Sequence, residues 1–176
     1  PFVGPAGKEL RKCAAAAGMA LSEVYLTNVI KDLQYPLKSY IDIPKDLRQQ
    51  VVVTEMGKAY INLLKEELEE LHPNIVMAIG GIALWALCER RGVMKWRGSI
   101  IPSSLIPGMK VVPIIHPSTI LPHGDKHQGI FLNSYLITHD LRRVLKHSGT
   151  PDLPAKQWDL ITAPSYYSTL EFLNFI

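Results

Sequence analysis

Short apolar runs rich in β-branched residues alternate with longer amphipathic segments along this chain, and this alternation constrains the fold most. The apolar runs cover residues 24–30, 74–81 and 110–118, and they have the length and composition of buried strands. Helical periodicity marks the segments around them, at residues 4–18, 58–73, 82–92 and 131–147. Such alternation places parallel strands in one sheet that helices cover. We therefore expect an α/β fold, a three-layer αβα sandwich around a central, mostly parallel sheet.

Local signals mark the ends of the expected helices. Gly18 is a C-cap candidate for the first helix, because glycine adopts the left-handed conformation without strain. Thr54 and Gly57 precede the second helix, and Pro73 ends it because proline lacks the amide that a helix needs. Residues 31–52 are polar and contain proline, which predicts a long loop of the kind that often carries function.

The 176 residues are enough for one domain with its own core, and we expect that domain to cover residues 1–147. Residues 148–176 differ in character, with spaced prolines followed by the strand-like sequence DLITA. They are predicted to form a linker or the start of a following unit. A terminal strand that packs on the domain is the alternative.

Charge, cysteines and hydropathy limit the class of protein. The net charge of +3 is compatible with a phosphate-bearing partner but does not require one. Cys13 and Cys88 lie in apolar runs and form no C-x-x-C pair, which argues against a zinc or redox motif and indicates buried thiols in a reducing compartment. No apolar run reaches the ~20 residues of a membrane span, and no signal peptide is visible. We expect a cytoplasmic protein without membrane contact.

Polar or glycine-containing motifs stand at the end of each predicted strand. They are Thr27-Asn28, Gly80-Gly81 and His116-Pro117-Ser118. Ligands of open α/β sheets bind beyond the carboxyl ends of the strands. The three motifs are therefore expected to meet at one ligand site.

Five segments carry a family resemblance when they are taken in order: PFVGPAGKEL, VYLTNVIK, NIVMAIGGIA, the RG of KWRG, and VVPIIHPSTIL. Together they resemble the iron–sulfur-type uracil-DNA glycosylases of bacteria and archaea, over about residues 1–146. The resemblance implies a DNA-repair enzyme that hydrolyses the N-glycosidic bond of deoxyuridine. Because that bond is hidden in the base stack, the nucleotide must be flipped out.

The resemblance assigns the substrate contacts to three residues. Phe2 is expected to stack on uracil, and Asn28 to read its O4 and N3–H with one amide. His116 is the expected catalytic residue, since its imidazole can stabilise the negative charge that develops on uracil O2. The alternatives are a core phenylalanine, an asparagine that caps a turn, and a histidine with a structural hydrogen bond.

The resemblance also implies contacts with the DNA backbone. Expected contacts come from Gly80, Gly81, Arg97 and Ser118, with Lys95 as a weaker candidate. Ile120 and Leu121 are the candidates for the wedge that fills the space of the flipped base. For the two glycines, close packing of a helix on the sheet is an equal alternative.

Two departures from the family pattern affect the cofactor and the active site. Asp32 and Ala59 occupy positions where the family has cluster cysteines, so we expect no iron–sulfur cluster and no other cofactor. The family's first motif, a Gly-Pro-Gly loop with an acidic residue that helps position the attacking water, has no counterpart in residues 1–176. We expect a fragment or processed product whose four-stranded sheet lacks its first strand and whose activity is weakened.

The expected partner is uracil-containing DNA, and the expected state is a monomer that forms part of a larger DNA-processing polypeptide in a bacterial or phage-infected cell. A weakened or non-catalytic DNA-binding domain of a phage-type replication protein is the main alternative. A hydrolase of small nucleobase or nucleotide substrates would use the same crevice without DNA. A steep dependence of DNA binding on salt would argue against this last alternative.

Overall fold

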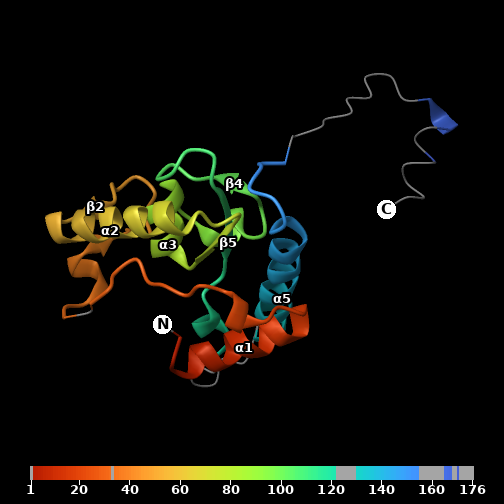
Figure 1. The fold of residues 1–176 in the computed structure, drawn as a ribbon, viewed down its shortest axis with the longest axis horizontal. Helices are drawn as coiled ribbons and strands as arrows, with labels where there is room; N and C mark the ends of the chain where they lie inside the picture. The colour runs from red at the N-terminus through yellow and green to blue at the C-terminus, as the bar shows by residue number, and fades with distance from the viewer. Residues whose placement is uncertain (1, 33, 122–129, 155–164, 168–169, 171–176) are drawn as a thin grey trace.

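The computed structural model describes residues 2–32, 34–121, 130–154, 165–167 and 170. It has the mixed α/β architecture that the sequence predicts (Figure 1). The helices are α1 (Pro5–Ala17), α2 (Glu55–Leu71), α3 (Gly81–Cys88), α4 (Val93–Trp96) and α5 (Ile130–His147). The strands are β1 (Ile41–Asp42), β2 (Val52–Val53), β3 (Val76–Ile79), β4 (Ile101–Pro102) and β5 (Lys110–Ile114). Short 3₁₀ turns span Leu21–Glu23, Leu37–Ser39 and Pro117–Ile120.

The main sheet has the strand order β3-β5-β4 in the described part of the chain. Strands β3 and β5 run parallel, from the pair Val76 and Val111 to the pair Ile79 and Ile114, which confirms the predicted parallel core. Strand β4 runs antiparallel to β5, so the sheet is mixed. A separate antiparallel pair, β1 and β2, begins within the stretch predicted to be a loop and ends at Val53, just beyond it. Strands β1, β2 and β4 span two residues each, too few for a recognisable period.

The strand predicted at residues 24–30 is wrong. The structure has a 3₁₀ turn at Leu21–Glu23, an extended Val24 and then residues without regular secondary structure, with no ladder to the described strands. Extended conformation is what β-branched residues favour, but a strand also needs a neighbouring backbone within hydrogen-bonding distance. In the described part of the chain, β3 has a neighbouring strand, β5, along one of its edges only.

Helices cover both faces of the sheet, as a three-layer arrangement requires (Figure 1). Successive residues of β5 point to opposite faces, so Val112 and Ile114 pack against α1 and α5 while Val111 packs against α2 and α3. Cys13 and Cys88 are buried and unpaired, in agreement with the prediction. Burial raises the pKa of the Cys88 thiol to about 11, which makes it unreactive at neutral pH.

The helix ends follow the predicted signals closely. Gly18 ends α1 in the left-handed conformation at φ 80°. The Thr54 hydroxyl accepts the Gly57 N–H at 3.2 Å, so α2 begins at Glu55, earlier than its apolar stripe indicates. His72 ends α2 directly before Pro73.

Residues beyond the predicted boundary at 147 contact the domain. The Asn74 amide donates to the Ser148 carbonyl at 2.9 Å. The Lys110 ammonium, 1% exposed, donates to the carbonyls of His147 and Thr150. The position of the boundary stays a prediction, and the DLITA sequence lies outside the described residues. None of the described helices combines the length and hydropathy needed to cross a membrane.

Candidate functional site

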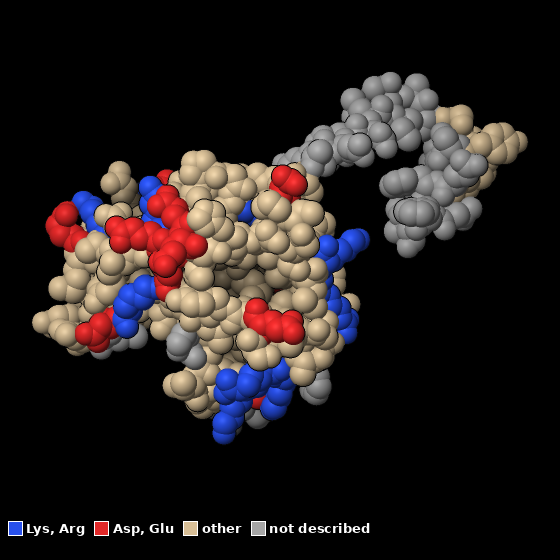
Figure 2. All heavy atoms as spheres, viewed as in Figure 1, with Lys and Arg blue, Asp and Glu red and all other residues tan. Residues whose placement is uncertain are grey.

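A cavity of about 1210 Å³ opens beside β3, and it collects most of the predicted site residues. Its walls come from the segment 24–30, from β3, from α2 and from the residues before α1. Figure 2 shows the surface hollowed near its centre, with acidic side chains gathered over α2 and basic ones along α5. Five predicted residues line the cavity: Phe2, Asn28, Gly80, Gly81 and His116.

The parallel pairing of β3 and β5 explains why Gly80 and His116 meet. The Gly80 N–H donates to the Ile114 carbonyl at 2.9 Å and so continues the ladder by one residue. Gly80 has φ +89°, a conformation that side chains disfavour, and a Cβ there would lie 3.4 Å from the His116 Cβ. The Gly80 amide is thus occupied within the sheet. The space beside Gly81 is open, because nothing lies within 4 Å of a Cβ built there.

Hydrogen bonds with Ser118 determine which nitrogen of the His116 ring carries the proton. The Ser118 backbone N–H donates to Nδ1 at 3.1 Å, and the Ser118 hydroxyl lies 2.8 Å from the same nitrogen. A nitrogen that accepts an N–H carries no proton of its own, so the proton of the neutral ring is on Nε2. Burial lowers the pKa of His116, which also favours the neutral form. The ring therefore keeps Nε2–H as a donor.

Phe2 lies next to His116, with the ring centroids 6.0 Å apart and the planes tilted by 33°. It is half-buried and packs against the core between α1 and α5. Its backbone rests directly on Gly7, because a Cβ built on Gly7 would fall 1.6 Å from the Phe2 carbonyl oxygen. Only glycine fits beneath Phe2 at that position.

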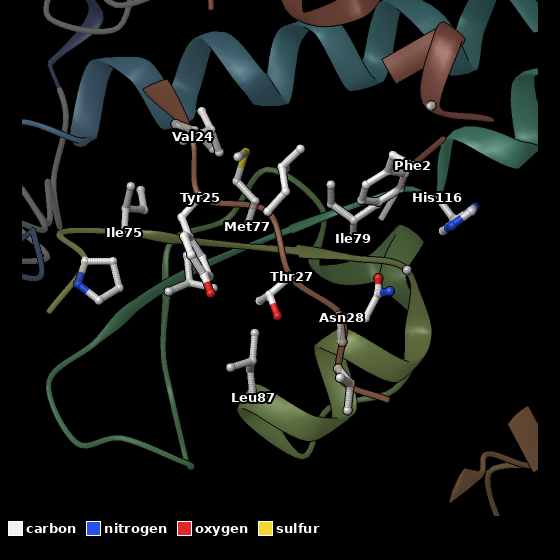
Figure 3. Close-up of a pocket in the computed structure, with 18 of the residues that line it drawn as sticks. Phe2, Val24, Tyr25, Thr27, Asn28, Ile75, Met77, Ile79, Leu87 and His116 are labelled. Atoms are coloured by element: carbon white, nitrogen blue, oxygen red, sulfur yellow. The ribbon is translucent and has the colours of Figure 1, made fainter. Parts of the chain in front are cut away.

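Asn28 is exposed on the segment 24–30, and Figure 3 draws it toward the same end of the cavity as Phe2 and His116. No hydrogen bond joins its amide to another described residue. Both the donor and the acceptor of this amide are thus available to a ligand.

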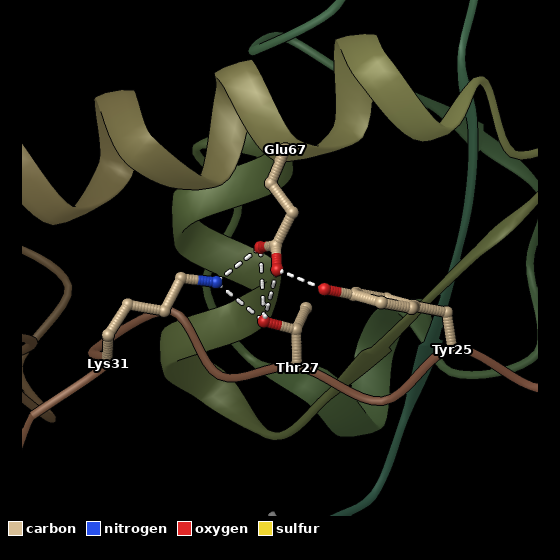
Figure 4. A network of polar contacts seen from close by, with 4 residues as sticks. All are labelled: Tyr25, Thr27, Lys31 and Glu67. Atoms are coloured by element: carbon tan, nitrogen blue, oxygen red, sulfur yellow. Dashed lines mark hydrogen bonds and ion pairs between the residues drawn. The ribbon is translucent and has the colours of Figure 1, made fainter.

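A polar network that sequence reasoning missed holds the segment that carries Asn28 (Figure 4). The Glu67 carboxylate on α2 accepts from the Tyr25 hydroxyl at 2.7 Å, from the Thr27 hydroxyl at 3.1 Å and from the Lys31 ammonium. Lys31 also donates to the Thr27 hydroxyl at 2.5 Å. Glu67 is one of several glutamates on α2, so nothing in the sequence singles it out.

The predicted DNA-backbone residues outside the cavity are placed differently. Arg97 donates to both carboxylate oxygens of Asp140, at 3.0 and 2.6 Å, and to the Leu136 carbonyl at 3.0 Å. Its guanidinium thus joins the end of α4 to α5, and its contact with DNA stays a prediction. Lys95 is exposed, with its ammonium 5.5 Å from the Trp96 ring centroid.

The structure separates the two wedge candidates. Ile120 is buried in the core between α1 and α5, so it cannot enter DNA without leaving that core. Leu121, half-buried at the end of the 3₁₀ turn, is the better candidate. Ser118 directs its hydroxyl to His116, and its predicted phosphate contact stays a prediction.

No group of three or more His, Cys, Asp or Glu side chains in the described part of the chain is arranged to hold a metal ion. Asp32 accepts a hydrogen bond from the Gln34 amide at 2.9 Å, and Ala59 lies exposed on α2. The expected absence of an iron–sulfur cluster stays a prediction that a measurement of iron content would decide.

Comparison with known proteins supports the resemblance. Residues 1–136 match the family model described as the Uracil DNA glycosylase superfamily. A DNA polymerase of Bacillus phage SP01 is 28% identical over 142 residues, which cover 80% of this chain and 14% of that protein. Type-4 uracil-DNA glycosylases of Thermotoga maritima and Archaeoglobus fulgidus are each 28% identical, over 69% of this chain and 57% and 58% of theirs. The chain thus spans only part of each of these relatives.

Proposed function

Because this chain belongs to the uracil-DNA glycosylase superfamily, we propose that it hydrolyses the bond between uracil and deoxyribose in DNA. The observation that carries the proposal is the grouping of Phe2, Asn28 and His116 on one cavity. A flipped nucleotide can enter such a cavity, whereas a stacked one cannot.

Phe2 and Asn28 would bind the flipped base. The Phe2 ring offers an apolar face for stacking beside the imidazole. The Asn28 amide can donate to uracil O4 and accept from N3–H at the same time. Cytosine presents the reverse pattern, and a site that leaves its polar groups unpaired rejects a ligand strongly.

His116 would stabilise the departing base. As the glycosidic bond breaks, negative charge develops on uracil O2, and a neutral Nε2–H can donate to it without transferring its proton. Ser118 supports this role because its N–H holds Nδ1 as an acceptor. The resemblance assigns the positioning of the attacking water to an acidic residue of the family's first motif, which has no counterpart in residues 1–176.

The direct test incubates the protein with an oligonucleotide that contains one uracil and then cleaves any abasic site with alkali. We expect cleavage at uracil and none in a matched oligonucleotide with thymine at that position. Intact uracil-containing oligonucleotide after incubation with the protein would refute the proposal.

A DNA-binding domain without catalysis is the second candidate. The match to a phage DNA polymerase over 80% of this chain favours it. This candidate predicts binding of DNA that weakens steeply with salt, together with no abasic sites in the alkali assay.

Gly7→Ala should disturb base binding through Phe2. The added Cβ would fall 1.6 Å from the Phe2 carbonyl oxygen, so the Phe2 backbone must move. We expect kcat/KM for uracil excision to fall about tenfold, in the range of one lost base–aromatic stack. Gly4→Ala is the matched control, because nothing lies within 4 Å of its Cβ position. Parental kcat/KM in Gly7→Ala would show that excision does not depend on where Phe2 sits.

Asn28→Asp should weaken uracil excision about tenfold, because a carboxylate cannot donate to O4 and leaves that group unpaired. It should also admit some cytosine, whose N4 amino group can donate to a carboxylate. Rates on oligonucleotides with uracil or cytosine at one position measure both effects. Asn62→Asp adds the same charge at an exposed position on α2, outside the cavity lining, as a control. Equal uracil rates in Asn28→Asp and the parent would exclude Asn28 from base recognition.

A further inference from the structure

The segment that carries Asn28 needs a support other than a β-ladder. Residues 25–28 belong to no helix or strand, no ladder joins them to the described strands, and they line the same cavity as β3. A recognition residue contributes its full binding energy only where its backbone is held in place.

The Glu67 carboxylate is the point at which this segment is attached to α2. It accepts hydrogen bonds from Tyr25, Thr27 and Lys31, residues that lie before and after Asn28 in the chain. The bond from Lys31 to Thr27 closes the network on itself (Figure 4). Asn28 is thus bracketed on both sides by residues bound to one helix side chain.

The network is partly shielded from water. The Glu67 and Lys31 side chains are 22% and 30% exposed, so their interaction is less screened than that of an ordinary surface pair. Burial alone would raise the pKa of Glu67, but the hydrogen bonds from Lys31, Tyr25 and Thr27 lower it below its usual value. Glu67 is therefore charged at neutral pH and keeps all three donors.

We infer that Glu67 is a positioning residue for uracil recognition: by binding Tyr25, Thr27 and Lys31, it fixes the Asn28 amide at the cavity. The inference rests on the proposed function and adds to it a specificity-determining residue on α2, outside the motifs that the family resemblance comprises. Glu67 touches no base itself, so its effect on the reaction passes through Asn28.

The first arm of the test needs no substrate. Backbone ¹⁵N relaxation of residues 24–31 reports how firmly the segment is held, because the order parameter is ~0.85 for a rigid backbone and below ~0.6 for a flexible one. In Glu67→Ala we expect the order parameters of these residues to fall toward the flexible range, with those of α2 unchanged. Glu66→Ala is the matched control, because it removes a neighbouring exposed glutamate and leaves the network intact. Parental order parameters in Glu67→Ala would overturn the inference.

The second arm measures the excision kinetics of the same variants. Glu67→Ala should raise KM for a uracil-containing oligonucleotide about tenfold with kcat nearly unchanged. This pattern is expected when the same binding energy is lost from the ground state and from the transition state. Glu67→Gln keeps an oxygen that accepts from Tyr25 and Thr27, and it should recover most of the parental KM. Glu66→Ala should match the parent.

The outcomes separate the inference from the proposed function. A parent protein that releases no uracil counts against the proposed function, while the relaxation arm still decides whether Glu67 holds the segment. Lower order parameters with parental KM in Glu67→Ala would show that the network serves the fold alone and would overturn the inference. A lower melting temperature with parental KM in the folded protein would do the same.

Discussion

Replacing His116 with alanine is expected to slow uracil excision about a hundred- to a thousandfold, the usual loss when one group that stabilises transition-state charge is removed. DNA affinity should change little, because the imidazole interacts with charge that develops only as the bond breaks. Single-turnover excision, measured beside the affinity for the same oligonucleotide, separates the two quantities.

The control for this variant is Thr119→Ala. It removes a hydrogen bond of 2.9 Å to the His116 carbonyl in the same 3₁₀ turn, yet it leaves the imidazole and both Ser118 contacts in place. Its excision rate should stay near that of the parent. An unchanged rate in His116→Ala would make His116 a structural residue, and the cavity would then need another group to stabilise the leaving base.

Asp140→Ala should destabilise the fold more than any other substitution considered for this chain. Asp140 is 1% exposed and is bound to Arg97, whose side chain is only 18% exposed. Removing one partner of a buried ion pair leaves the other charge uncompensated. We expect the free energy of unfolding to fall by about 3 kcal/mol, near the lower end of the usual range, because Arg97 keeps some contact with water. Urea unfolding at neutral pH measures the loss.

Two further variants show whether the uncompensated charge is the cause. His139→Ala removes a 55%-exposed neighbour at 3.6 Å from Asp140 and should cost well under 1 kcal/mol. Changing both partners, as Arg97→Met with Asp140→Leu, should recover most of the stability, because no charge then stays buried. If the double variant is as unstable as Asp140→Ala, packing at this position outweighs charge.

The sequence predicted the part of the site that depends on the β3–β5 pair. Parallel strands end at the same edge, so Gly80 and His116 had to be neighbours once both runs were recognised as strands. The periodicity of α1, α2 and α5 likewise follows from residues close in the chain, and it predicted the helices to within a few residues.

The rest of the site depends on contacts between distant parts of the chain. Residues 24–30 have strand composition, but whether they pair depends on a neighbouring backbone that composition does not reveal. Arg97 and Asp140 lie 43 residues apart, and Lys31 and Glu67 lie 36 apart. Because its partner is so far away in the sequence, Arg97 next to Gly98 is as compatible with a phosphate contact as with an internal ion pair.

The hydrogen bonds of the Lys110 ammonium limit how far the C-terminal end of this domain can be truncated. Its buried ammonium is satisfied by carbonyls at His147 and Thr150, one on each side of the boundary predicted from composition. A polypeptide ended at residue 147 would lose the second acceptor and leave the ammonium short of a partner, which is costly inside a protein. We therefore expect the folded domain to include residues 148–150, and limited proteolysis of the native protein should spare the chain up to that point.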